Sequence, residues 1–67
     1  MKQLEARWTG TEEWVDVDYV ANLDEAQTRA TQFQLEHRVK SSIEWTPGSF
    51  GVYFGSNKYV TFRLRDP

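Results

Sequence analysis

The stretch Val15–Ala26, Val-Asp-Val-Asp-Tyr-Val-Ala-Asn-Leu-Asp-Glu-Ala, decides the fold because a strand pattern gives way within it to a helix pattern. Its first half alternates apolar residues with aspartates, and this period of two indicates a strand with one buried face. In its second half Asn22 is a favoured helix N-cap, and Glu25 stands three residues later, where a capping-box carboxylate belongs. The stretch therefore predicts a strand that leads straight into a helix.

The predicted helix has one narrow apolar stripe. The residues that recur at helical spacing are Leu23, Ala26, Ala30, Phe33 and His37. Polar side chains occupy the opposite side of the helix. Because β-branched residues begin at Val39, we expect the helix to end near residues 38–40 and to lay its stripe against a sheet.

Upstream of this stretch, residues 3–8 also alternate, and the turn residues 9–13 connect them to the strand of residues 14–20. Two alternating runs joined in this way form a β-hairpin. In its second strand we expect one face to meet the core and the other to meet solvent. The expected core-facing residues are Val15, Val17 and Tyr19, and the expected outward residues are Trp14, Asp16, Asp18 and Val20.

Downstream of the helix, residues 39–45, 50–54 and 59–64 predict three more strands. Pro47-Gly48 favours the centre of a type II turn, and residues 55–58 favour a tight hairpin connection. The order β-β-α-β-β-β predicts an α+β fold, with a single, mainly antiparallel sheet of about five strands and one helix packed on one face. The expected core comprises Leu4, Ala6, Trp8, Val15, Val17, Leu23, Ala26, Ala30, Phe33, Ile43, Val60, Phe62 and Leu64.

The composition sets further bounds. The chain has 67 residues, 39% hydrophobic and 27% charged, which is a globular balance and predicts a single domain over residues 1–67. It has no cysteine, so neither disulfides nor thiolate-bound zinc stabilise the fold. No apolar window approaches the roughly 18 residues of a membrane span, and the first residues lack the apolar core of a signal peptide. We expect a cytoplasmic location.

Catalytic and metal-binding chemistry find little support in the sequence. The one histidine, His37, ends the apolar stripe of the helix, where a packed residue or a favourable charge near the helix C-terminus is the more common role. Asp16 and Asp18, on one face of a strand, could hold Mg²⁺ or act as acid and base only with further ligands. No glycine-rich phosphate loop is present. We expect no metal, no cofactor and no enzymatic activity.

Binding of another protein suits the charge pattern best. Residues 1–25 hold seven acidic and two basic residues, whereas residues 26–67 hold three acidic and six basic ones. An exposed aromatic residue ringed by charge is typical of an interface hot spot. We therefore predict that an acidic hairpin docks on a basic groove of a host protein through Glu12, Glu13, Trp14, Asp16 and Asp18. Alternatively, Trp14 packs across the outer sheet face against Arg7 or a tyrosine.

A second function uses the C-terminal hairpin. Lys58, Tyr59, Arg63 and Arg65 share one side of the last predicted strand and the turn before it. Cationic and aromatic side chains on an open sheet face can bind single-stranded nucleic acid. The sequence pI of about 5.2 opposes this alternative, because phosphate binding depends on positive charge.

Residues 17–30 also carry a resemblance. The run Val-Asp-Tyr-Val-Ala-Asn-Leu-Asp-Glu-Ala, followed by Ala30, leads a strand into a capped "LDEA…A" helix. This pattern resembles small bacteriophage host-takeover proteins, such as the RNA polymerase inhibitors of T7-like phages. The resemblance implies a phage-encoded inhibitor of a host enzyme. The aromatic hairpin of residues 50–65 departs from that pattern.

Overall fold

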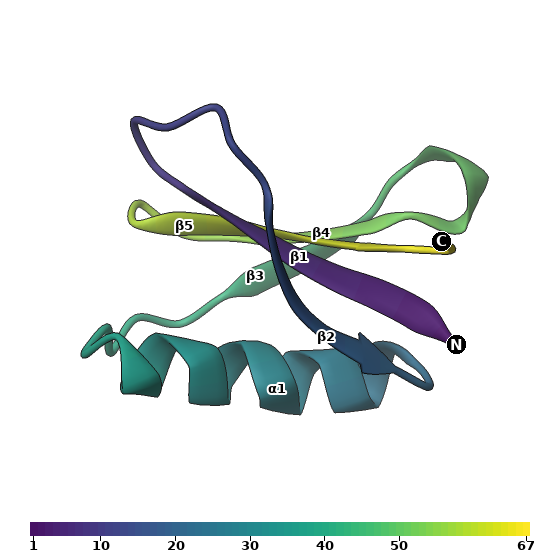
Figure 1. The fold of residues 1–67 in the computed structure, drawn as a ribbon, viewed down its shortest axis with the longest axis horizontal. Coiled ribbons are helices and arrows are strands. Elements are labelled where there is room, and N and C mark those ends of the chain that lie inside the picture. Colours follow the sequence, from purple (N-terminus) through teal and green to yellow (C-terminus); the bar gives the residue numbers. More distant parts are fainter.

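The computed structural model describes all 67 residues and contains a five-stranded sheet crossed on one side by a helix (Figure 1). Its elements are β1 (Lys2–Trp8), β2 (Val15–Val20), α1 (Leu23–Glu36), β3 (Glu44–Pro47), a 3₁₀ turn (Ser49–Gly51), β4 (Tyr53–Ser56) and β5 (Val60–Arg65). The predicted α+β architecture and the order β-β-α-β-β-β are confirmed.

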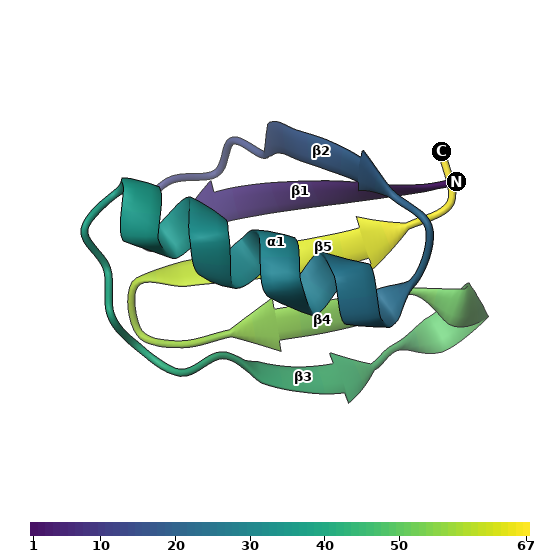
Figure 2. The ribbon, with the colours of Figure 1, turned by 90° about the horizontal axis from the view of Figure 1, so that it is seen from below.

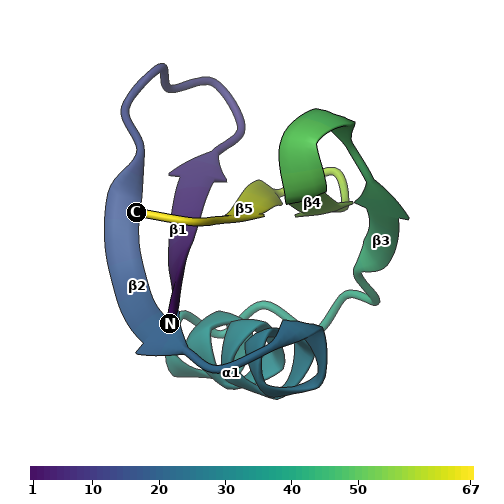
Figure 3. The same cartoon turned by 90° about the vertical axis from the view of Figure 1, so that its right-hand side faces the viewer.

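The strands lie in the order β2-β1-β5-β4-β3, and every neighbouring pair is antiparallel. The first and last strands therefore pair in the middle of the sheet, with Leu4 opposite Leu64 and Ala6 opposite Phe62. Seen from below, α1 crosses the central strands (Figure 2). Seen end-on, the sheet arches over α1, with β2 and β3 as its two edges (Figure 3).

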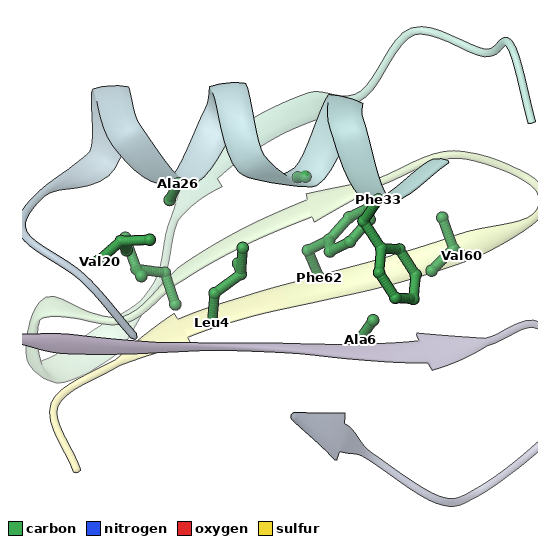
Figure 4. Close-up of a cluster of buried hydrophobic side chains, with 9 residues drawn as sticks. Leu4, Ala6, Val20, Ala26, Phe33, Val60 and Phe62 are labelled. Atoms are coloured by element: carbon green, nitrogen blue, oxygen red, sulfur yellow. The ribbon is translucent and has the colours of Figure 1, made fainter. Parts of the chain in front are cut away.

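The core lies between α1 and the sheet (Figure 4). Its nine buried apolar residues are Leu4, Ala6, Val20, Ala26, Ala30, Phe33, Val60, Phe62 and Leu64. The ring of Phe33 stands edge-on to Phe62 at 5.7 Å between centroids and 5.6 Å from Trp8. The small alanines of α1 let the helix lie close to the sheet. The aromatic rings fill the core near the C-terminal end of α1.

The start of α1 is as predicted. The Asn22 side chain accepts a hydrogen bond of 2.9 Å from the backbone N–H of Glu25. The helix ends at Glu36, slightly earlier than expected, and Arg38 adopts a left-handed conformation with φ of 62°. This reversal turns the chain out of the helix.

The strand predicted over residues 39–45 is shorter in the structure and begins only at Glu44. The reason is Gln34, a buried polar residue of α1. Its amide donates to the carbonyl of Ser41 at 2.7 Å and accepts from the side chain of Asn57 at 2.6 Å. Asn57 also donates to the carbonyl of Ser42 at 3.3 Å. These bonds hold the backbone of residues 41–42 to side chains instead of a neighbouring strand.

The predicted faces of β2 are correct for Val15 and Asp16 and wrong from Asp18 onward, because the strand contains a β-bulge between them. Glu5 of β1 lies opposite Asp16, but the next residue, Leu4, lies opposite Asp18, so Val17 is extra. The two aspartates consequently lie on opposite faces of the sheet. A one-residue insertion reverses the orientation of every side chain beyond it.

Burial follows from this shift. Val20, expected to face outward, is buried in the core, whereas Tyr19, expected to face the core, is exposed. Val15 precedes the bulge and lies opposite Ala6 on the predicted side, but it is exposed there. Val17 is half-buried and packs against the core. Of the other expected core residues, Trp8, Leu23 and Ile43 lie half-buried at its margin.

The turn between β3 and β4 also differs from its prediction. Pro47 ends β3 instead of occupying the centre of a type II turn. The backbone N–H of Gly48 donates to the carbonyl of Val52 at 2.6 Å and closes a longer turn. Phe50, expected in a strand, stands in this turn with φ of 58°. The tight hairpin connection before β5 does form, but it spans residues 57–59 instead of 55–58, because Gly55 and Ser56 belong to β4. The Asn57 side chain accepts from the N–H groups of Tyr59 and Val60.

Candidate binding surface

The sheet face that points away from α1 is uncovered by any second layer (Figure 3). We call it the outer face. Register and alternation place on it the side chains of Gln3, Glu5, Arg7, Asp16, Tyr19, Phe54, Thr61, Arg63 and Arg65. It is rich in arginine, acid and aromatic side chains, and therefore differs in chemistry from the apolar face beneath it.

Glu5 is the centre of the outer face. Its carboxylate is only 7% exposed and accepts from Arg65 through both oxygens, with Nε to Oε1 at 2.8 Å and Nη2 to Oε2 at 3.3 Å. Arg63 donates to Oε1 as well, at 2.9 Å. The hydrogen bond from Arg65, aided by Arg63, holds the pKa of Glu5 below its ordinary value although burial raises it. The same bond raises the pKa of Arg65. One acid thus fixes two arginines.

Trp14 covers this ion cluster. The Arg63 guanidinium lies 4.1 Å from the centroid of the Trp14 ring, and that of Arg7 lies 5.4 Å from it. Trp14 is therefore half-buried and packs on the outer face. This arrangement matches the alternative in which the tryptophan packs against Arg7. An arginine held against a tryptophan face keeps its charge while losing mobility.

The predicted docking acids separate into two groups. Glu12 and Glu13 are exposed, make no ion pair, and belong to the β1–β2 loop that rises beyond the sheet on the side away from α1 (Figure 1). Asp18 faces the other way and pairs with Arg29 of α1 at 3.3 Å. Asp16 stays on the outer face, where it accepts a 2.6 Å hydrogen bond from Gln3. The structure brings Glu12, Glu13, Trp14 and Asp16 to one side and leaves Asp18 out.

The alternative site is divided as well. Arg63 and Arg65 are held by Glu5 in the middle of the face. Lys58 and Tyr59 stand at the β4–β5 turn, where the lysine ammonium lies 5.1 Å from the tyrosine ring centroid. Lys58 makes no ion pair, so its charge is available to a ligand.

Sequence reasoning missed the two polar residues that organise the molecule, Glu5 and Gln34. Glu5 reads as an ordinary outward residue of a strand, and only the pairing of β1 with β5 places it between two arginines. Gln34 is next to the apolar stripe of the helix, and a glutamine beside Phe33 is the only local signal of its position.

The remaining titratable groups form no further site. His37 packs its ring against Phe33 at 4.4 Å and Trp8 at 5.1 Å between centroids, and its Nδ1 lies 2.9 Å from the Phe33 carbonyl oxygen. No three histidine, aspartate or glutamate side chains are grouped where they could hold a metal ion. No helix has the length and apolar character needed to cross a membrane.

Comparison with known proteins adds no relative. Neither the protein-family models, nor the curated proteins, nor the solved structures provide a match to this chain.

Proposed function

We propose that this protein is a non-enzymatic binding module that docks on a second protein through its outer face and the β1–β2 loop. The observation that carries the proposal is the pair of unpaired carboxylates, Glu12 and Glu13, which stand beyond the sheet beside Trp14. Neither carboxylate forms an ion pair within the chain, so a cationic surface on a partner would complement their charge.

Rigidity of the surrounding face supports the same function. Glu5 fixes Arg63 and Arg65 by hydrogen bonds, and Arg63 in turn supports the ring of Trp14. Binding through this surface costs little side-chain entropy of this protein, because its side chains are already ordered. The hairpin acids would speed docking, and the half-buried tryptophan and arginines would supply contact area.

The partner would present a basic groove, of the kind that enzymes use to hold nucleic acid. The protein would then be an inhibitor similar to phage host-takeover proteins, which the resemblance of residues 17–30 supports. In that form, docking of the acidic hairpin would occupy the groove and block its substrate.

The test is affinity capture from bacterial lysate with four forms of the protein. Glu12→Lys with Glu13→Lys reverses the hairpin charge, and Glu36→Lys with Glu44→Lys makes the same change in net charge elsewhere on the surface. We expect the parent and the control pair to retain the same stoichiometric partner and the hairpin variant to lose it. Asp18→Lys, which alters the opposite face, should behave like the control. Equal capture by the hairpin variant contradicts the proposal, provided that its melting temperature is unchanged.

Nucleic-acid binding remains the second candidate, and the unpaired Lys58 against Tyr59 supports it. Fluorescence anisotropy with single-stranded and duplex oligonucleotides distinguishes the two functions. Steeply salt-dependent binding that falls with Lys58→Glu and Tyr59→Ala, but not with the hairpin variant, would favour nucleic acid.

A further inference from the structure

Phe50 combines an unfavourable backbone conformation with a ring that is not buried within its own chain. It stands at the tip of the β3–β4 turn, is 99% exposed, and has φ of 58° and ψ of 36°. A left-handed backbone disfavours phenylalanine, and full exposure of the ring loses the benefit of burying it. Asparagine or glycine would suit the turn better. A strained aromatic residue presented to solvent indicates a contact outside its own chain.

The surface has a hollow that could receive such a ring. It measures about 310 Å³ and lies between the second half of α1 and the segment that leads to β3. Leu35, Val39 and Ile43 are its three apolar lining residues, and the other five lining residues, Lys40 among them, are polar. Leu35 is 54% exposed although it is a large apolar side chain. Since a cavity of about 150 Å³ accommodates benzene, the hollow has room for a phenyl ring.

Phe50 and the hollow lie at opposite ends of the molecule. In Figure 2 the Ser49–Gly51 turn is at one end of the long axis, together with the start of α1, and the end of α1 is at the other. The chain is 28 Å along that axis. Phe50 therefore cannot reach the hollow of its own chain, but it can reach that of a neighbour placed end to end.

The two ends differ in the balance of their unpaired charges, with Glu44, next to Ile43, as the acidic exception at the hollow end. The end with the hollow has Arg38 and Lys40, and neither makes an ion pair. The end with Phe50 has Asp24 and Glu25 in the first turn of α1, also without an ion pair. An end-to-end arrangement brings these opposite charges closer together, which favours association in that orientation.

We propose that copies of this chain associate head to tail, with Phe50 of one copy seated in the hollow of the next. The contact is heterologous, so the bound pair still offers one free Phe50 and one free hollow. Assemblies then extend beyond dimers as the concentration rises. This inference does not depend on the proposed docking of the outer face, which lies elsewhere.

The test uses the pure full chain and two complementary variants in sedimentation velocity. Phe50→Asn removes the ring and retains a residue that tolerates a left-handed backbone. Leu35→Lys blocks the hollow at an exposed helix position where lysine is a good helix former. Val15→Thr, which alters an exposed apolar residue outside both sites, is the matched control. All are compared from about 10 μM to about 1 mM, a range suited to a small interface.

We expect the parent and Val15→Thr to sediment faster with increasing concentration, and each complementary variant to lose at least about tenfold in association constant. An equimolar mixture of Phe50→Asn and Leu35→Lys should form a one-to-one pair that grows no further, because only one intact ring and one intact hollow remain to meet. A parent that stays monomeric at the highest concentration overturns the proposal. So does a mixture that fails to pair, or a Phe50→Asn variant that associates like the parent.

Discussion

The ring of Trp45 lies over Gly55 so closely that a Cβ atom at residue 55 would stand 2.6 Å from its Cδ2 and Cε2 atoms. The two residues face each other across β3 and β4, and the same ring stacks on Phe62 at 6.2 Å between centroids. Only glycine leaves this space, so Gly55 determines how the edge strand β3 closes over the core.

Replacement of Gly55 by alanine should therefore displace Trp45. We expect a loss of about 1–3 kcal/mol in the free energy of unfolding, the usual cost of overpacking, together with a change in tryptophan fluorescence. Urea denaturation measures the first and emission spectra the second. Ser56→Ala, at the next and exposed position, should change neither. Full stability in Gly55→Ala would mean that the ring does not sit where we place it.

The Glu5 cluster predicts a pH dependence of stability. The pKa of Glu5 is lowered in the folded protein, so its contribution is fully present above the unfolded pKa of about 4.3 and is lost as the pH falls through the lower folded value. Thermal melts below about pH 4.3 should narrow the difference between the parent and Glu5→Gln. A difference in stability that stays constant from neutral to acidic pH would contradict the ion cluster.

At neutral pH the same Glu5→Gln change leaves Arg63 and Arg65 without their carboxylate. Both arginines keep contact with water, so we expect a cost of about 1–2 kcal/mol, below the ~3–5 kcal/mol of a fully buried pair. Denaturation at low and high salt gives the check. Glu44→Gln, an exposed acid without an ion pair, is the control and should cost little.

Trp14 and Arg63 should be energetically coupled. A double-mutant cycle with Trp14→Ala and Arg63→Gln should give a coupling free energy of about 0.5–1 kcal/mol, the range of a partly exposed cation–π contact. Trp14→Ala with Arg29→Gln provides the comparison, because Arg29 lies on the helix and does not touch the ring. Coupling of equal size in both cycles would show that the effect is general and not due to this contact.

Gln34 should be the least replaceable polar residue of α1. Gln34→Ala leaves the Ser41 carbonyl without its side-chain donor and leaves the Asn57 amide with only its 3.3 Å bond to Ser42, and we expect a loss of about 1–3 kcal/mol. Amide hydrogens of residues 39–43 should then exchange faster than those of the central strands. The neighbouring exposed change Gln32→Ala should leave both measurements as in the parent.

Local chemistry in the sequence was enough to predict the elements and their order. The Asn22 cap, the alanine-rich stripe of α1 and the alternation in β1 and β5 act over a few residues, and each predicted its element correctly. The predictions that failed depended on relations between distant parts of the chain. The bulge at Val17 depends on how β2 pairs with β1, because Val15–Val20 offers apolar residues to either face.

The candidate surface could likewise be predicted only where it depends on local sequence. Trp14 and the hairpin acids were singled out from the sequence, and so were the two arginines of β5. Their arrangement could not be predicted, because Glu5 meets Arg65 only when chain segments 60 residues apart become neighbours. Burial of Glu5 and exposure of Phe50 run against the hydropathy of each side chain, so no pattern of hydropathy predicts them.

The pairing of β1 with β5 has a consequence for folding kinetics. The hairpin of β1 and β2 can form early because its contacts are local, but the centre of the sheet waits for the last strand to return across almost the whole chain. Closing so long a loop costs entropy before the central contacts repay it, which makes the contact order high for a protein of this length. During synthesis, the apolar sides of β1 and α1 would stay without their central partner until Val60–Arg65 had left the ribosome.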